Sequence, residues 1–272
     1  MLQPLRPGPQ PDRPAPAVRW IPTHTLPGPW QMAIDGQLHD QACTDPGAGA
    51  VLRLYRWSRP TLSLGFHQKT LPTHWQELAR SGAFDLVRRP TGGRAVLHGG
   101  DLSYALIWPA APGPRATVYG RCCGWLCRAF GDLGLPLQPG QSAPSRDRSS
   151  CFATSTSADL IHADGSKRIG SAQLWRGGCL LQHGSIMITP QAELWERIFG
   201  EEPPLLPALP LGFDDLEALL LRSAARCLPL DCGGVSLVLR DLTPEEWTGV
   251  AAKAQGESSY ATHRNPGSRS RG

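Results

Sequence analysis

Short runs in which apolar and polar residues alternate dominate the first half of the chain. Residues 51–57 alternate leucines with arginines, and residues 61–66 form a second run after Pro60. A strand repeats with a period of two, so each run predicts a strand, and the break between them predicts an antiparallel hairpin. Asp164-Gly165 favours a type I′ turn and predicts another hairpin. Further strands are predicted at residues 85–89, 94–97, 102–108, 158–163, 166–175 and 179–188.

From residue 117 onward, apolar residues recur with the period of a helix. In residues 117–133 they recur three or four positions apart, which predicts the first helix. Later helices are predicted at residues 191–199, at residues 213–227 and from Thr243, where Thr243 and Glu246 have the spacing of a capping box. Strand hairpins mixed with helices, without strict βαβ alternation, predict an α+β fold.

Composition separates two tails from one domain. The chain of 272 residues contains 30 Gly and 27 Pro. Together they make up about a fifth of the chain, well above the combined share of roughly 12% in an average protein. Residues 1–19 are Pro-rich and residues 253–272 are polar, so both are predicted to be tails. Residues 20–252 are predicted to form one catalytic domain.

Charge and hydropathy exclude several classes of protein. The net charge is +4, but the two predicted tails carry +5, which leaves −1 on the domain and gives a nucleic-acid groove little support. No apolar stretch approaches ~18 residues, so no membrane-spanning helix is predicted. The start resembles neither a secretory signal nor a transit peptide. We therefore expect a cytoplasmic protein whose eight cysteines are reduced thiols.

The densest cluster of unusual residues lies between residues 88 and 98. Gly92 and Gly93 let the backbone approach a ligand closely, and the arginines beside them can hold a carbonyl or phosphate oxygen. The segment fits neither a Walker loop nor a dinucleotide fingerprint. The alternative is a plain hairpin turn with solvated arginines.

Cys151 lies in a loop flanked by arginines, and nearby positive charge lowers the pKa of a thiol, as a nucleophile requires. Lys167 follows the Asp164-Gly165 turn, where its ammonium can fold over the hairpin. Small residues at 170–172 and at Gly184 leave room for a slot between strands. The alternatives are an incidental cysteine, a solvated lysine and tight strand packing. The cysteines at 122, 123 and 127 lack metal-ligand spacing, so no metal is predicted.

In this order, the segments resemble the biotin/lipoate protein ligase superfamily over most of residues 30–240. The segments that carry the resemblance are Trp30-Gln31-Met32-Ala33-Ile34-Asp35, Leu52-Arg53-Leu54-Tyr55, Leu62-Ser63-Leu64-Gly65 and residues 88–98 and 165–185. Arg94 stands where lipoate ligases carry a third glycine, and Cys151 matches the cysteine of the thiol-dependent octanoyltransferases. The chain departs from the family pattern at Gly36 and Ala105.

The resemblance implies a mixed, largely antiparallel sheet with packed helices, and a cysteine-type octanoyl-[acyl carrier protein]:protein N-octanoyltransferase. Cys151 would match the nucleophile and Lys167 its paired lysine. The predicted substrate-binding residues are Arg89, Thr91, Gly92, Gly93, Arg94, His98, Gly170, Ser171, Ala172, Gln173, His183 and Gly184.

The resemblance also implies partners. The donor would be octanoyl-acyl carrier protein, and the acceptors would be lipoyl domains of 2-oxoacid dehydrogenase E2 subunits and the glycine cleavage H protein, with no nucleic acid, membrane or cofactor involved. Three alternatives stay open: an ATP- and Mg-dependent lipoate or octanoate ligase, an amidotransferase between lipoyl-type proteins, and a binding protein without turnover. ATP dependence separates the first of these from the transferase.

Overall fold

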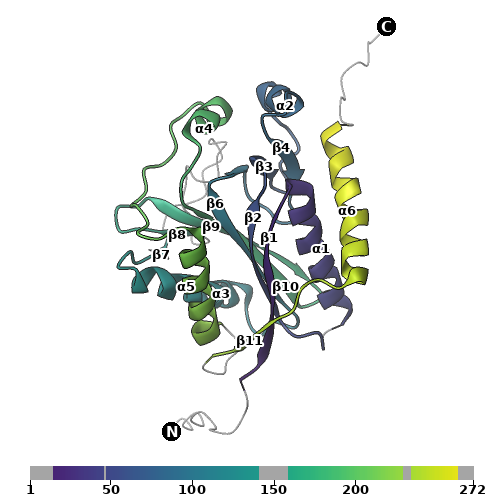
Figure 1. Cartoon of the computed structure of the whole chain (residues 1–272), viewed down its shortest axis with the longest axis vertical. Coiled ribbons are helices and arrows are strands. Elements are labelled where there is room, and N and C mark those ends of the chain that lie inside the picture. The colour runs from purple at the N-terminus through teal and green to yellow at the C-terminus, as the bar shows by residue number, and fades with distance from the viewer. Residues whose placement is uncertain (1–14, 46, 141–158, 229–233, 263–272) are drawn as a thin grey trace.

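The computed structural model describes residues 15–45, 47–140, 159–228 and 234–262 (Figure 1). Its centre is an eight-stranded sheet in the order β11-β1-β2-β6-β10-β9-β8-β7. The strands are β1 (Ala17–Leu26), β2 (Val51–Trp57), β6 (Asp101–Trp108), β7 (Gln138–Pro139), β8 (Asp159–Ile161), β9 (Lys167–Arg176), β10 (Cys179–Met187) and β11 (Ser236–Leu239). β1 pairs in parallel with β11 and β2, and the remaining pairs are antiparallel. This confirms the predicted α+β class with a mixed, largely antiparallel sheet.

A smaller sheet lies beside the end of β2. It has three strands in the order β4 (Asp85–Arg88), β3 (Thr61–Leu64) and β5 (Val96–His98). Trp75 of helix α2 (Thr73–Arg80) and Trp195 of helix α4 (Ala192–Phe199) share a buried apolar cluster with Leu62 and Leu64 of β3. The small sheet therefore has its own core.

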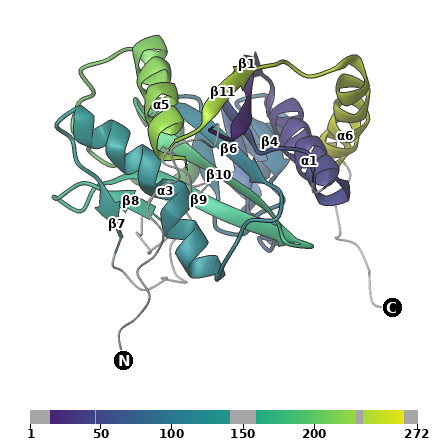
Figure 2. The ribbon, with the colours of Figure 1, turned by 90° about the horizontal axis from the view of Figure 1, so that it is seen from below.

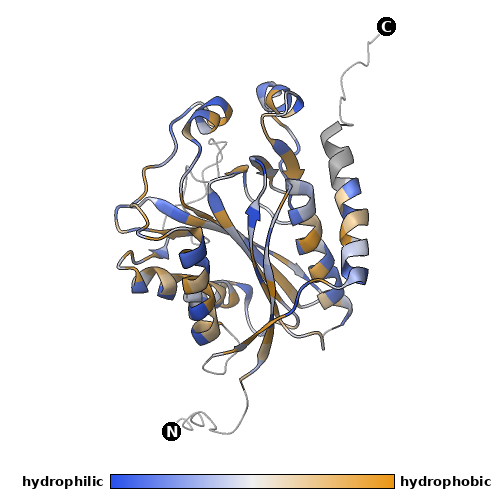
Figure 3. Cartoon of the chain, viewed as in Figure 1, coloured by the Kyte–Doolittle hydropathy of each residue, from blue (hydrophilic) through white to orange (hydrophobic). Residues whose placement is uncertain are grey.

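Helices cover both faces of the large sheet (Figures 1 and 2). Helices α3 (Arg115–Asp132) and α5 (Phe213–Cys227) share one core with it, and α1 (Gly28–Thr44) and α6 (Pro244–Thr262) share the other. In Figure 3 these helices carry both apolar and polar residues, as expected when one side packs and the other meets water. On β2, Leu54 belongs to the first core and Tyr55 to the second, so both faces of this strand are buried.

Two predictions about the first hundred residues are wrong. Helices α1 and α2 precede residue 117, and α1 shows no clear amphipathic pattern because polar Gln31, Asp35 and His39 are buried along with its apolar residues. β2 and β3 do not form a hairpin, because β1 and β6 occupy both edges of β2, and β3 joins the other sheet.

The hairpin between β8 and β9 is confirmed, but its predicted turn type is wrong. The backbone N–H of Gly165 donates to His162 O at 3.0 Å, and His162 N–H donates to Ser166 O at 2.9 Å. Gly165 has φ +85°, whereas a type I′ turn would also require a positive φ at Asp164. The chain therefore forms a three-residue loop that closes with a left-handed glycine.

Both tail boundaries are also wrong, because residues placed in the tails belong to folded elements. β1 begins at Ala17, and Arg19 pairs with Glu246 at 2.7 Å. α6 runs to Thr262, and Lys253 pairs with Asp40 at 2.5 Å. Backbone pairing and ion pairs hold these segments without an apolar run. No helix among the described residues is long and apolar enough to cross a membrane.

The capping box at the start of α6 is confirmed. Glu246 N–H donates to Thr243 Oγ1 at 3.2 Å, and Thr243 N–H donates to Glu246 Oε2 at 2.8 Å. The Arg19 ion pair uses the same glutamate, so the cap also ties β1 to α6.

Candidate active site

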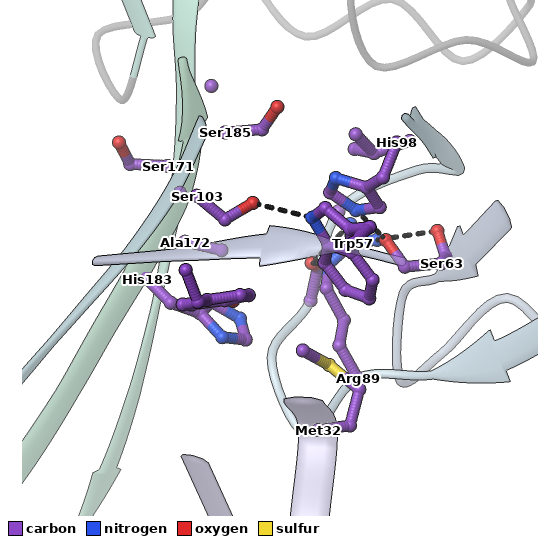
Figure 4. A pocket seen from close by; sticks show the side chains of 16 residues that line it. Met32, Trp57, Ser63, Arg89, His98, Ser103, Ser171, Ala172, His183 and Ser185 are labelled. Carbon is purple, nitrogen blue, oxygen red and sulfur yellow. Dashed lines mark hydrogen bonds between the residues drawn. The ribbon is translucent and has the colours of Figure 1, made fainter. Parts of the chain in front are cut away.

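A pocket of about 470 Å³, counting its open mouth, lies between the two sheets (Figure 4). Strands of both sheets, helix α1 and the loop after β4 contribute to its wall. The lining residues are Met32, Tyr55, Trp57, Ser63, Arg89, Gly92, Gly93, Val96, His98, Ser103, Gly170, Ser171, Ala172, His183, Gly184 and Ser185. Nine of the twelve predicted substrate-binding residues are among them, although their role in binding stays a prediction.

Small residues of β9 keep one side of the pocket open. Ala172 lies directly across from His183 of β10, and Gly170 lies across from Ser185. A Cβ atom on Gly184 would lie 2.6 Å from Tyr104 Cε1, so this position has no room for a larger residue. The polar side chains of His183 and Ser185 on β10 therefore lie beside small residues of β9.

The loop between β4 and β5 is folded onto the end of β3. Gly93 has φ +95°, and a Cβ atom on Gly65 would lie 1.8 Å from Gly93 O. Arg89 binds this loop from inside, because its guanidinium donates to Ser63 O at 2.8 Å, Gly92 O at 2.9 Å and Arg94 O at 2.6 Å. The backbone therefore uses much of the donor capacity of Arg89.

Arg94 differs from Arg89. Its Nη1 atom is buried and has no hydrogen-bond partner in the part of the chain that the structure describes. Arg94 and Thr91 are not lining residues, but both belong to the loop that forms the wall. Arg94 therefore has a guanidinium donor that no described residue uses.

A serine and a histidine of one wall are linked in a row to an aspartate that does not itself line the pocket. Ser63 Oγ lies 2.8 Å from His98 Nε2, and His98 Nδ1 lies 2.7 Å from Asp101 Oδ2. Burial raises the pKa of Asp101, but the interactions with His98, Ser185 and Gly99 outweigh burial and lower it overall. Asp101 is therefore a carboxylate at neutral pH. His98 also stacks on Trp57, with ring centroids 4.1 Å apart.

A second row of the same kind lies beside the opposite wall. Thr91 Oγ1 lies 2.7 Å from His183 Nε2, and His183 Nδ1 lies 2.8 Å from Asp35 Oδ2. Arg53 Nη1 donates to Asp35 Oδ1 at 2.7 Å, with both side chains buried. His183 is thus held in one orientation at the edge of the pocket.

The structure describes only one residue of the predicted catalytic pair. Cys151 lies outside the described residues. Lys167 is 3% exposed and forms an ion pair with Asp159 Oδ1 at 2.8 Å. This burial rules out the solvated turn lysine, but Lys167 is not among the residues that line the pocket. Gln173 also lies off the wall, where it donates to Gln182 Oε1 at 2.7 Å.

The described cysteines lie apart from the pocket wall. All six carry free thiols, and burial raises the pKa of Cys122 and of Cys123 to about 12, which keeps both thiols protonated. One group of possible metal ligands joins His39 and Cys43 of α1 to Cys179 of β10. Arg176 Nε already donates to Cys43 Sγ at 3.3 Å.

Comparison with known proteins gives the family. The model of the lipoyl protein ligase A/B catalytic domain matches residues 28–204, which include every described residue of the pocket. The chain belongs to this family. Among curated lipoyl ligase A/B relatives, the octanoyltransferase LipM of Carboxydothermus hydrogenoformans is 39% identical over 186 residues, covering 66% of this chain and 68% of the relative.

Other relatives agree. The octanoyltransferase LipM of Symbiobacterium thermophilum is 33% identical over 66% of this chain and 68% of its own length. Among solved structures, lipoate-protein ligase A bound with ATP has a TM-score of 0.70 at 17% identity, covering 90% of this chain and 96% of the other. A bipartite lipoate protein ligase from Thermoplasma acidophilum has a TM-score of 0.68 at 15% identity, over 90% and 94% of the two chains. The structural likeness establishes the lipoyl ligase A/B fold.

Sequence reasoning missed several residues of the site. Ser63, Asp101 and Asp35 escaped because their partners come from other strands or helices. A weak signal exists for Asp101, since it follows His98 by three residues across a Gly-Gly turn, which is close enough for a hydrogen bond. No local pattern marks Ser63 or Asp35 as a site residue, although both lie in segments that carry the family resemblance.

Proposed function

We propose that this chain is an octanoyltransferase of protein lipoylation that moves an octanoyl group from octanoyl-acyl carrier protein to a lysine of a lipoyl domain. The observation that carries the proposal is the largely apolar pocket beside the small residues of β9, in a chain that is 39% identical over 186 residues to an octanoyltransferase. Burying six methylenes there would contribute roughly 5 kcal/mol, at about 0.8 kcal/mol each. That is enough to prefer an octanoyl chain over short acyl groups.

In the first half-reaction, the Cys151 thiolate attacks the thioester carbonyl carbon and expels the thiolate of the carrier's prosthetic group. One thioester replaces another, so the step is nearly balanced in free energy and needs no nucleotide. We propose that no cofactor takes part. The buried cation of Lys167 is the candidate group for favouring the Cys151 thiolate.

In the second half-reaction, the neutral ε-amine of the acceptor lysine attacks the acyl-cysteine carbonyl. An amide bond forms, the Cys151 thiolate leaves, and the amine gives up one proton to a base. Backbone N–H groups of the glycine loop at Gly92 and Gly93 are the candidates for stabilising the oxyanion. The buried donor of Arg94 lies in the same loop.

The test is nucleotide-free acylation followed by transfer. Purified protein is incubated with octanoyl-acyl carrier protein, its intact mass is measured, and a lipoyl domain is then added. We expect an octanoyl adduct without ATP, its loss in Cys151→Ala, and its retention in the matched control Cys43→Ala, which removes a free thiol that does not line the pocket. Transfer that requires ATP and Mg would instead support the ligase alternative.

A further inference from the structure

The Ser63, His98 and Asp101 row has a defined proton arrangement. A carboxylate only accepts hydrogen bonds, so His98 Nδ1, which lies 2.7 Å from Asp101 Oδ2, carries a proton. In the neutral imidazole, His98 Nε2 is then the acceptor, and it lies 2.8 Å from Ser63 Oγ. Arg89 Nη1 donates to the same Oγ at 3.2 Å, so the Ser63 proton is directed to His98. A hydroxyl nucleophile and its base have this arrangement.

Asp101 is fixed by more than His98. Ser185 Oγ donates to its Oδ2 at 2.6 Å, Ser103 Oγ donates at 3.0 Å, and Gly99 N–H donates to Oδ1 at 3.0 Å. Trp57 restrains the imidazole from the other side through their stacked rings. The base is therefore held before any substrate arrives.

The two rows differ in their access to the pocket. Ser63 and His98 both line it, as Figure 4 shows, and Arg89 lies beside them. Thr91, the hydroxyl of the second row, does not line it. An acyl chain in the pocket can therefore present its carbonyl to Ser63 but not to Thr91.

We propose that Ser63 and His98 form a second nucleophilic centre of this pocket, which accepts the acyl group of medium-chain acyl thioesters and activated esters and hydrolyses them slowly. Asp101 is its positioning residue. The proposal rests on the proposed function in one respect, that an acyl chain enters this pocket. Its nucleophile is independent of Cys151.

The chemistry is balanced without a further reagent. Ser63 Oγ attacks the carbonyl carbon while its proton moves to His98 Nε2. The bond from carbon to sulfur, or to the ester oxygen, then breaks, and the leaving group takes the proton from His98. Water attacks the resulting acyl-serine, His98 receives its proton and returns it to Ser63 Oγ, and the fatty acid leaves. The guanidinium of Arg89 lies next to Ser63 Oγ. It stabilises the negative charge that develops on the former carbonyl oxygen in the tetrahedral intermediate.

The experiment combines labelling with turnover in the full chain. Protein carrying Cys151→Ala, which removes the other nucleophile, is treated with octyl fluorophosphonate, and the modified residue is located by peptide mass spectrometry. Hydrolysis of 4-nitrophenyl octanoate is measured in the same protein. Further variants are Ser63→Ala, Asp101→Asn and the control Ser81→Ala, whose hydroxyl is exposed at the end of α2.

We expect one adduct on Ser63, its absence in Ser63→Ala, and full labelling in Ser81→Ala. Asp101→Asn should lower kcat for the ester by a factor of about 100 or more with little change in KM, because a misaligned imidazole still permits binding. An octanoyl adduct on Ser63 should also survive neutral hydroxylamine, which removes a thioester from Cys151.

Folded protein without a Ser63 adduct, or ester turnover that Cys151→Ala alone abolishes, overturns the proposal. If Ser63→Ala does not fold, labelling of Ser63 in the Cys151→Ala protein still tests the proposal. Failure of the proposed function has a different signature, which is the absence of a hydroxylamine-sensitive adduct on Cys151 in the wild-type protein.

Discussion

The ion pair between Asp35 and Arg53 offers the sharpest test of how the pocket is held in place. Both side chains are buried, and Arg53 Nη1 lies 2.7 Å from Asp35 Oδ1. Asp35→Asn keeps the shape of the side chain but leaves the guanidinium without a counter-charge. Removing one partner of a buried pair costs about 3–5 kcal/mol. Gln31 O still accepts from Arg53 at 3.1 Å, so we expect a loss near 3 kcal/mol.

Urea unfolding followed by tryptophan fluorescence measures this loss directly. Because a typical domain is stable by about 5–15 kcal/mol, the midpoint should move well below that of the wild type. The matched control is Asp214→Asn, which removes the carboxylate from an exposed pair with Arg56 and should change stability little.

A double-mutant cycle with Arg53→Met completes the test. The variant carrying both changes has no unpaired guanidinium, so its loss should be smaller than the sum of the two single losses by at least about 1 kcal/mol. A loss below about 1 kcal/mol in Asp35→Asn, or additive losses in the cycle, would refute the buried-pair argument.

The remaining predictions concern the cap, the chain boundaries and pH. Thr243→Ala removes the hydroxyl of the capping box and should cost about 1 kcal/mol by urea unfolding, whereas Thr248→Ala, one turn further on, should cost less. A fragment of residues 20–252 loses the Arg19 ion pair and should melt below a fragment of residues 15–262 in calorimetry; equal melting temperatures would contradict this. The pKa of Asp101 is lowered from 3.8 in the folded chain, so stability should fall as pH drops below about 4. Asp101→Asn should flatten that slope in acid titrations.

Features encoded locally could be predicted from the sequence. The capping box needs only Thr243 and Glu246, three residues apart, and the three runs that became β2, β9 and β10 show their periodicity within ten residues. Helix α1 was not predicted because its buried polar side chains bond to buried partners instead of facing water. Asp35, for example, pairs with Arg53. Hydropathy cannot register a partner that lies elsewhere in the chain.

In the site, too, only features encoded locally or by the family resemblance could be predicted. Glycine and arginine content marked the loop at 88–98, and resemblance supplied the pairing of Cys151 with Lys167. The hydroxyl rows could not be predicted, since Ser63 and His98 are 35 residues apart and Asp35 and His183 are 148 apart. Only the fold brings these partners together.

The parallel pairing of β1 with β11 sets the order in which the protein can be completed during synthesis. Arg19 and Arg240, which are bonded through Arg19 Nε, are separated by 221 residues. At roughly 5–20 residues per second, a ribosome needs about 10–45 s to make that span. Throughout that interval the outer edge of β1 has no partner strand to cover it, and exposed strand edges attract other chains. The nascent protein therefore keeps an unpaired strand edge until residues 236–239 are made, and a chaperone that binds β1 during this interval would protect that edge.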